Sequence, residues 1–122
     1  MASFEDKREH FTKLRLSEHK LAIESDRRRG IKLENRICSQ CRNPNHVIED
    51  EFHFIIDCDK YKENRAHLFK SIDNTNKTFK ILSSKEKFTY IMSYKTNIED
   101  ILQFVDVAFK LRTEPGTNIS NS

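Results

Sequence analysis

Cys38-Ser39-Gln40-Cys41, followed after a loop by His53-Phe54-Ile55-Ile56-Asp57-Cys58, is the stretch of this chain that decides its fold. A structural zinc ion takes four ligands in a tetrahedron, with thiolate sulfur at about 2.3 Å and imidazole nitrogen at about 2.0–2.1 Å. The C-x2-C turn lets two thiolates converge on one ion, and the H-x4-C segment supplies the other two ligands. The spacing therefore predicts a zinc site held by Cys38, Cys41, His53 and Cys58, which are all the cysteines of the protein and one of its histidines.

The same residues could instead form a disulfide, or the histidine ligand could be His46. A disulfide is disfavoured because the number of cysteines is odd and the chain begins without a secretory signal. His46 lies between the two ligand pairs and is an alternative to His53. We prefer His53 because residues 49–56 alternate and predict a short strand that would hold its ring, whereas His46 follows the turn Asn43-Pro44-Asn45.

Length and composition predict one domain with a modest core. The chain has 122 residues, of which 36% are hydrophobic and 34% are charged, so a metal cross-link would supply stability that burial alone does not. We expect a mainly α-helical fold of four to five helices with a small zinc knuckle and a short β-hairpin. The expected parts are a helical lead-in (1–36), the knuckle (37–60), a helical extension (61–112) and a disordered tail (113–122).

Several functional classes are disfavoured by what the sequence lacks. It has no run of about 20 apolar residues and no apolar signal core at its start, so we expect no membrane partner and a soluble, intracellular protein, either nuclear or cytoplasmic. Gly30 and Gly116 are its only glycines, which argues against a glycine-rich phosphate loop or a dinucleotide fingerprint. We therefore expect no small-molecule substrate.

Helix signals outside the knuckle are local. Ser3 with the acids after it predicts an N-cap for a helix to about Leu14, and Asp59 predicts the cap of a helix through Ile72. Capping boxes at Ser83-x-x-Glu86 and Thr96-x-x-Glu99 predict two more helices, the second closed by the positive charges of Lys110 and Arg112. The pattern from Leu16 to Ile23 fits either a helix or a strand.

The segment that leads into the knuckle and its first cysteine turn is basic. Six basic residues between positions 27 and 42 face one acid, Glu34, and such a cluster is a candidate surface for nucleic-acid phosphates. The alternative is a solvated charged turn. The predicted nucleic-acid-binding residues are Arg27, Arg28, Arg29, Lys32, Arg36 and Arg42.

Several segments of this chain, covering residues 11–112, resemble the zinc-binding region found downstream of the polymerase in reverse transcriptases of LINE-type (non-LTR) retrotransposons. The segments that carry the resemblance are Phe11-Thr12-Lys13-Leu14-Arg15-Leu16-Ser17-Glu18-His19, Leu21-Ala22-Ile23-Glu24, Gly30-Ile31, Arg36-Ile37-Cys38-Ser39-Gln40-Cys41, Glu49-Asp50-Glu51-Phe52-His53-Phe54 through Cys58, Tyr61 to Arg65, Phe88-x-x-Ile91-Met92 and Ala108-Phe109-Lys110-Leu111-Arg112. Two features depart from the family pattern: the loop before His53 is longer than in compact members, and Asp59 stands where proline is common.

The resemblance implies a zinc-stabilised accessory domain, which would help to bind template RNA or target DNA and whose partner could be the parent reverse transcriptase. Carried over by position, the ligands are again Cys38, Cys41, His53 and Cys58. A polymerase site needs paired aspartates holding magnesium, and the nearest match, Phe104-Val105-Asp106-Val107, has only one.

Four protein ligands leave no open position for a catalytic water, so we expect no enzyme activity. The alternative function is a structural or protein-interaction module braced by zinc.

Overall fold

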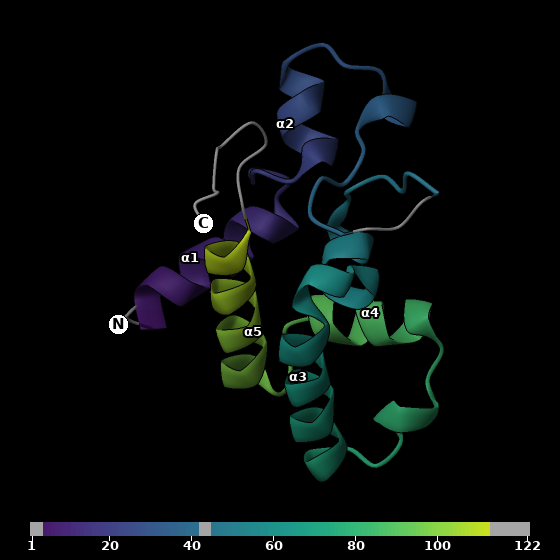
Figure 1. The fold of residues 1–122 in the computed structure, drawn as a ribbon. Helices are drawn as coiled ribbons and strands as arrows, with labels where there is room; N and C mark the ends of the chain where they lie inside the picture. The colour runs from purple at the N-terminus through teal and green to yellow at the C-terminus, as the bar shows by residue number, and fades with distance from the viewer. Residues whose placement is uncertain (1–3, 42–44, 113–122) are drawn as a thin grey trace, which may run out of the picture.

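The computed structural model describes residues 4–41 and 45–112 as a bundle of helices (Figure 1). The predicted cap Ser3, the predicted contact Arg42 and the predicted disordered tail 113–122 lie outside the described residues. The α-helices are α1 (Phe4–Arg15), α2 (Ala22–Arg28), α3 (Lys62–Thr75), α4 (Ser84–Met92) and α5 (Ile98–Leu111). Shorter helical turns lie at η1 (Leu33–Asn35), η2 (His53–Asp57), η3 (Asp59–Tyr61) and η4 (Phe79–Ile81). The expected mainly helical fold is thus confirmed.

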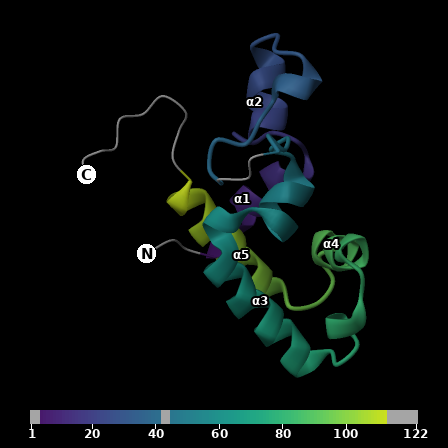
Figure 2. The same ribbon diagram turned by 45° about the vertical axis from the view of Figure 1, so that its right-hand side comes forward.

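Helix α5 is the centre of the bundle. Its sequence repeats apolar residues at helical spacing, and Ile101, Leu102, Phe104, Val105 and Ala108 are all buried. The helix packs against α1 on one side and α3 on the other. Figures 1 and 2 both show α3 and α5 side by side and running in opposite directions. None of the helices in the described residues is long and apolar enough to cross a membrane.

The core joins the three parts of the chain that the sequence distinguishes. Phe11 and Leu14 of α1, Phe54 of η2 and Leu68 of α3 belong to the same buried cluster as the apolar residues of α5. The ring of Phe54 packs against that of Phe109 on α5, with 4.6 Å between the ring centroids. The lead-in, the knuckle and the helical extension therefore share one hydrophobic core.

Only one of the two predicted capping boxes is present. The amide of Glu86 donates to Ser83 Oγ (3.1 Å) and the Ser83 amide donates to Glu86 Oε1 (2.9 Å), which confirms the start of α4. The box at Thr96 is wrong, because α5 begins at Ile98 after Asn97, whose φ is 55°. The Thr96 hydroxyl instead donates to Tyr90 Oη at 2.7 Å.

The predicted cap of α3 is also wrong. Asp59 lies inside the η3 turn, and the residue before α3 is Tyr61, which makes no side-chain capping bond. The segment from Leu16 to Ile23, left open by its pattern, turns after Ser17 (φ 59°) and enters α2 at Ala22. Gly30 follows α2 with a φ of 77°, a conformation that suits glycine.

The strand expected over residues 49–56 is wrong, because residues 51–57 are helical. Every residue from His53 to Ile56 is buried, so the segment is surrounded on all sides rather than on alternate ones. Asp50 starts the turn by accepting the His53 amide on its side chain at 2.8 Å. Within the described residues, β-pairing is confined to one antiparallel bridge between Ile37 and Ile48, so the predicted hairpin is not established.

A buried ion pair connects the knuckle to the end of α5. Arg112 donates two hydrogen bonds to the Glu49 carboxylate, Nε to Oε2 at 2.8 Å and Nη2 to Oε1 at 2.6 Å, and both side chains are almost fully buried. Glu49 Oε1 also accepts the amide of Ala22, the first residue of α2. Arg112 was expected to act on the C-terminal carbonyls of its own helix; it holds the knuckle instead.

We expect Arg112→Met to lower the free energy of unfolding by about 3–5 kcal/mol, because it leaves Glu49 buried and unpaired. Urea denaturation at saturating metal measures this loss. Arg29→Met is the matched control, since Arg29 pairs with Asp26 at the surface, and it should cost less than about 1 kcal/mol. Adding Glu49→Gln to Arg112→Met should restore stability, because no buried charge is then unpaired; a double variant less stable than Arg112→Met would contradict this role.

Candidate metal centre

Four potential metal ligands meet at one point of the structure. One atom from each of Cys38, Cys41, His53 and Cys58 lies within 4.8 Å of all the others. Cys38 Sγ is 3.8 Å from Cys58 Sγ, and Cys41 Sγ is 3.4 Å from His53 Nε2. Three of these residues are buried and Cys41 is half-buried. This group could hold a metal ion.

The distances match those between ligands of one tetrahedral ion and are too long for a disulfide. Two thiolates at tetrahedral corners about 2.3 Å from an ion are about 3.8 Å apart, and a thiolate and an imidazole nitrogen are about 3.6 Å apart. The observed separations of 3.8 and 3.4 Å are close to both values. A disulfide needs sulfur atoms about 2.05 Å apart, and all three cysteines are free.

The C-x2-C half of the site is held by the single β-bridge. The amide of Cys38 donates to Val47 O at 2.9 Å, and the amide of Glu49 donates to Arg36 O at 3.0 Å. The Gln40 amide lies 3.4 Å from Cys38 Sγ and donates to it, a bond that favours thiolate. The backbone is therefore paired with the segment around Val47 and Ile48 at the first ligand, Cys38. Two residues later, the Gln40 amide turns back to bond the sulfur of that ligand.

The other half of the site depends on the wide turn of η2. The Cys58 amide donates to the carbonyl of His53 at 2.7 Å, five residues earlier, which is the hydrogen-bond spacing of a π-helix. This bond keeps His53 and Cys58 next to each other. The turn supplies the rigidity that we had expected from a strand, so the histidine assignment rested on the wrong element.

Arg65 of α3 supports the turn from behind. Its buried guanidinium donates to three backbone carbonyls, from Nε to Ile55 O (2.7 Å) and from Nη2 to Phe54 O (3.2 Å) and Cys58 O (3.0 Å). The carbonyls of Phe54 and Ile55 lie in the last turn of η2, where helical partners run out, and the Cys58 carbonyl, which also accepts the Tyr61 amide at 3.3 Å, follows it. Arg65 thus ties the ligand-bearing segment to the helix that packs on α5.

Protonation couples the ligands. The hydrogen bond from the Cys58 thiol, against the effect of burial, holds the pKa of Cys38 below its usual range, and the same bond raises the pKa of Cys58. Burial opposes the charged form of His53, but the bond to Cys38 and the negative charges of Cys38, Asp57 and Asp50 together raise its pKa. Ligands must lose their protons to bind a metal, so acid competes with the ion at this site.

The competing histidine lies elsewhere. His46 is exposed, has a φ of 53°, and does not belong to the group of ligand atoms that meet.

The predicted nucleic-acid-binding residues differ in what their side chains bond to in the structure. Arg27 and Arg29 are exposed and pair with Glu24 (2.7 Å) and Asp26 (3.1 Å), while Lys32 is exposed after α2. Arg28 donates to His19 O at 2.9 Å. The half-buried Arg36 donates to Ile31 O (2.9 Å) and Ile23 O (3.2 Å), so its guanidinium braces the chain.

The supporting residues were missed by sequence reasoning. Arg65 entered the sequence analysis only as the end of the resembling segment Tyr61 to Arg65, and Glu49 and Asp50 only as parts of the expected strand and of the resembling segments. The spacing Asp50-x-x-His53 is a helix N-cap pattern and could have been recognised. Nothing local distinguishes Arg65 or Glu49, because their partners are distant in the sequence or belong to another element.

A scan against protein-family models found no match, and neither the curated proteins nor the solved structures compared with this chain include one that matches it. The four-ligand geometry is therefore the main support for a functional assignment.

Replacing Arg65 by methionine should weaken metal binding by about 10- to 100-fold while leaving all four ligands in place, as expected for a residue that orients ligands from outside the coordination sphere. Competition with a chromophoric chelator measures this affinity. Lys70→Met, an exposed change on the same helix, is the control and should leave affinity unchanged. Equal affinities in the two variants would show that the turn does not need Arg65.

Proposed function

We propose that this chain is a zinc-stabilised, non-catalytic accessory domain of a retrotransposon reverse transcriptase, and that it assists RNA or DNA binding. The observation that carries the metal part is the convergence of three thiols and one imidazole at tetrahedral distances. The family assignment is supported only by the sequence resemblance described above.

The chemistry of the donor set favours zinc over other ions. Thiolate and imidazole are soft or borderline ligands, and a tetrahedron with three sulfurs and one nitrogen is a common structural zinc site. Magnesium and calcium prefer oxygen ligands, which this group does not supply. When bound, the ion would link residues 38–41 to residues 53–58 and so add its binding free energy to folding.

A closed site argues against catalysis at the metal. Four protein ligands leave no position for an activated water or a substrate atom. Asp106, the one aspartate of the nearest polymerase-like sequence, is buried inside α5 beside Lys110 at 3.0 Å, which is an ordinary place for a helix residue.

Nucleic-acid binding is supported by the exposed edge of α2. Arg27, Arg29 and Lys32 remain at the surface, and their carboxylate partners, where they have them, lie on the same helix. Exposed pairs of this kind are weak, so phosphates could replace the carboxylates. The alternative is a structural or protein-interaction module, in which zinc only braces the helices and these charges are solvated.

One tightly bound zinc per chain is the expected result of elemental analysis on purified protein. Cys58→Ala should lose the ion, whereas His46→Ala should retain it, because only Cys58 belongs to the converging group. Chelation should abolish the amide NMR dispersion of residues 37–61. Absence of stoichiometric metal, or equal loss in both variants, would contradict the ligand assignment.

The nucleic-acid part is tested by replacing Arg27, Arg29 and Lys32 with glutamine, which spares the two arginines bonded to the backbone. Affinity for short RNA and DNA should fall similarly for unrelated sequences, and the slope of log K against log salt should shrink by roughly 0.7–0.9 for each lost phosphate contact.

The control variant, matched for lost charge, replaces Lys80, Lys85 and Lys95 with glutamine. These three lysines are exposed around α4. Figure 1 shows α4 and the turn before it far from α2. If the control triple reduces affinity as much as the α2 triple, binding is non-specific attraction to net charge. If wild type binds neither nucleic acid at low salt, the alternative module is favoured.

A further inference from the structure

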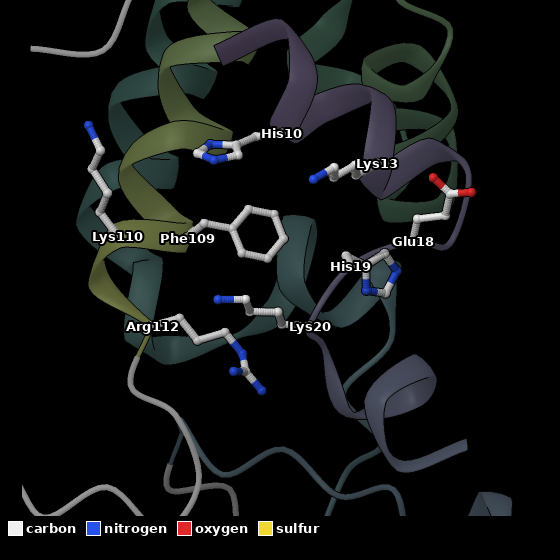
Figure 3. Close-up of a pocket in the computed structure, with 8 residues that line it drawn as sticks. All are labelled: His10, Lys13, Glu18, His19, Lys20, Phe109, Lys110 and Arg112. Carbon is white, nitrogen blue, oxygen red and sulfur yellow. The ribbon is translucent and has the colours of Figure 1, made fainter. Parts of the chain in front are cut away.

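A cavity of about 430 Å³ lies between α1, α5 and the loop that joins α1 to α2. It is away from the metal ligands, and none of its lining residues belongs to the predicted nucleic-acid-binding set. Its volume is within the range of small-ligand sites. The lining residues, shown in Figure 3, are His10, Lys13, Glu18, His19, Lys20, Phe109, Lys110 and Arg112.

The walls of this cavity are fixed by interactions on their far sides. The Leu21 amide donates to His19 Nδ1 (3.2 Å), so Nε2 carries the proton that is shared with Glu51 Oε2 at 2.6 Å. Arg112 is held by Glu49, and Phe109 packs on Phe54. Ligands therefore meet a cavity that is already formed.

Two lysines bring positive charge into the cavity. In Figure 3 the amino groups of Lys13 and Lys20 point into the space beside the Phe109 ring, whereas the carboxylate of Glu18 and the amino group of Lys110 point away from it. Lys110 and Arg112 are already matched by Asp106 and Glu49. Lys13 pairs with the exposed Glu9 at 3.1 Å, a surface contact that contributes little and can be exchanged for a phosphate.

The combination of an aromatic ring with two flanking ammonium groups matches one chemical unit. Nucleotides present a planar base and an anionic phosphate, and proteins that bind single strands pair aromatic rings with bases and lysines with phosphates. An acidic peptide would use the lysines but has no group that needs the ring. Base pairs in a duplex do not expose a base face, so the strand must be single.

We propose that this cavity binds one nucleotide of a single-stranded nucleic acid, with the base against Phe109 and the phosphate between Lys13 and Lys20. The inference rests on the proposed function and adds a second contact, made by residues other than those of the α2 edge. The two contacts would bind separate nucleotides of one strand.

The test measures binding of a short single-stranded oligoadenylate and of an abasic oligomer of the same length. Phe109→Leu keeps the apolar contact with Phe54 and should weaken oligoadenylate binding by about 5- to 150-fold while leaving abasic binding unchanged. Lys13→Gln with Lys20→Gln should weaken both oligomers and reduce the salt slope by about 0.7 per lost phosphate contact. Retained zinc and an unchanged melting temperature would show that these variants fold.

Two outcomes separate this inference from the proposed function. If wild type and the cavity variants bind oligoadenylate equally while the α2 triple binds weakly, the cavity inference is overturned and the proposed function stands. If wild type binds no oligomer at low salt, both fail. Binding of a polyglutamate peptide that depends on Lys13 and Lys20 but not on Phe109 would overturn the cavity inference in favour of an acidic protein partner.

Discussion

A single buried carboxylate connects the parts of this small protein. Glu49 accepts two bonds from Arg112 after α5 and one from the first amide of α2, and its backbone carbonyl accepts the amide of Ile23. Its own amide donates to Arg36 O beside the first cysteine pair. The charge of an isolated buried carboxylate is costly, so the pair has to be complete for the surrounding elements to assemble. The knuckle, α2 and the central helix are consequently placed relative to one another by the same residue.

The segment that begins at Glu49 also carries the metal site. Within ten residues it supplies the ion-pair partner of Arg112, the partner of His19 in Glu51, and the ligands His53 and Cys58. Arg65 then closes the segment by binding three of its carbonyls. A bound ion would stabilise this segment, and with it the wall of the cavity that His19 and Arg112 line. If the proposed ion and nucleotide both bind, their binding would be positively coupled through folding.

Several elements could be predicted from local sequence, and the failures share a cause. The Ser83–Glu86 box and the stripe of α5 are local patterns, and both are present. The alternation over residues 49–56 was misleading because four consecutive residues are buried, so period-two burial does not apply. Thr96 fits a capping pattern but bonds Tyr90, a contact that brings the end of α4 to the start of α5.

By itself, the sequence determined the four candidate metal ligands and the helical class, because ligand spacing and the 3.6-residue repeat are properties of neighbouring residues. Tertiary structure alone decided which charged side chains bond to distant parts of the chain. Arg36 and Arg112, which look like other surface arginines in the sequence, are bonded to distant groups, while Lys13, Lys20 and Phe109 come together only when α1 and α5 pack. Burial and long-range pairing set the role of a charged residue, and neither is written in its local sequence.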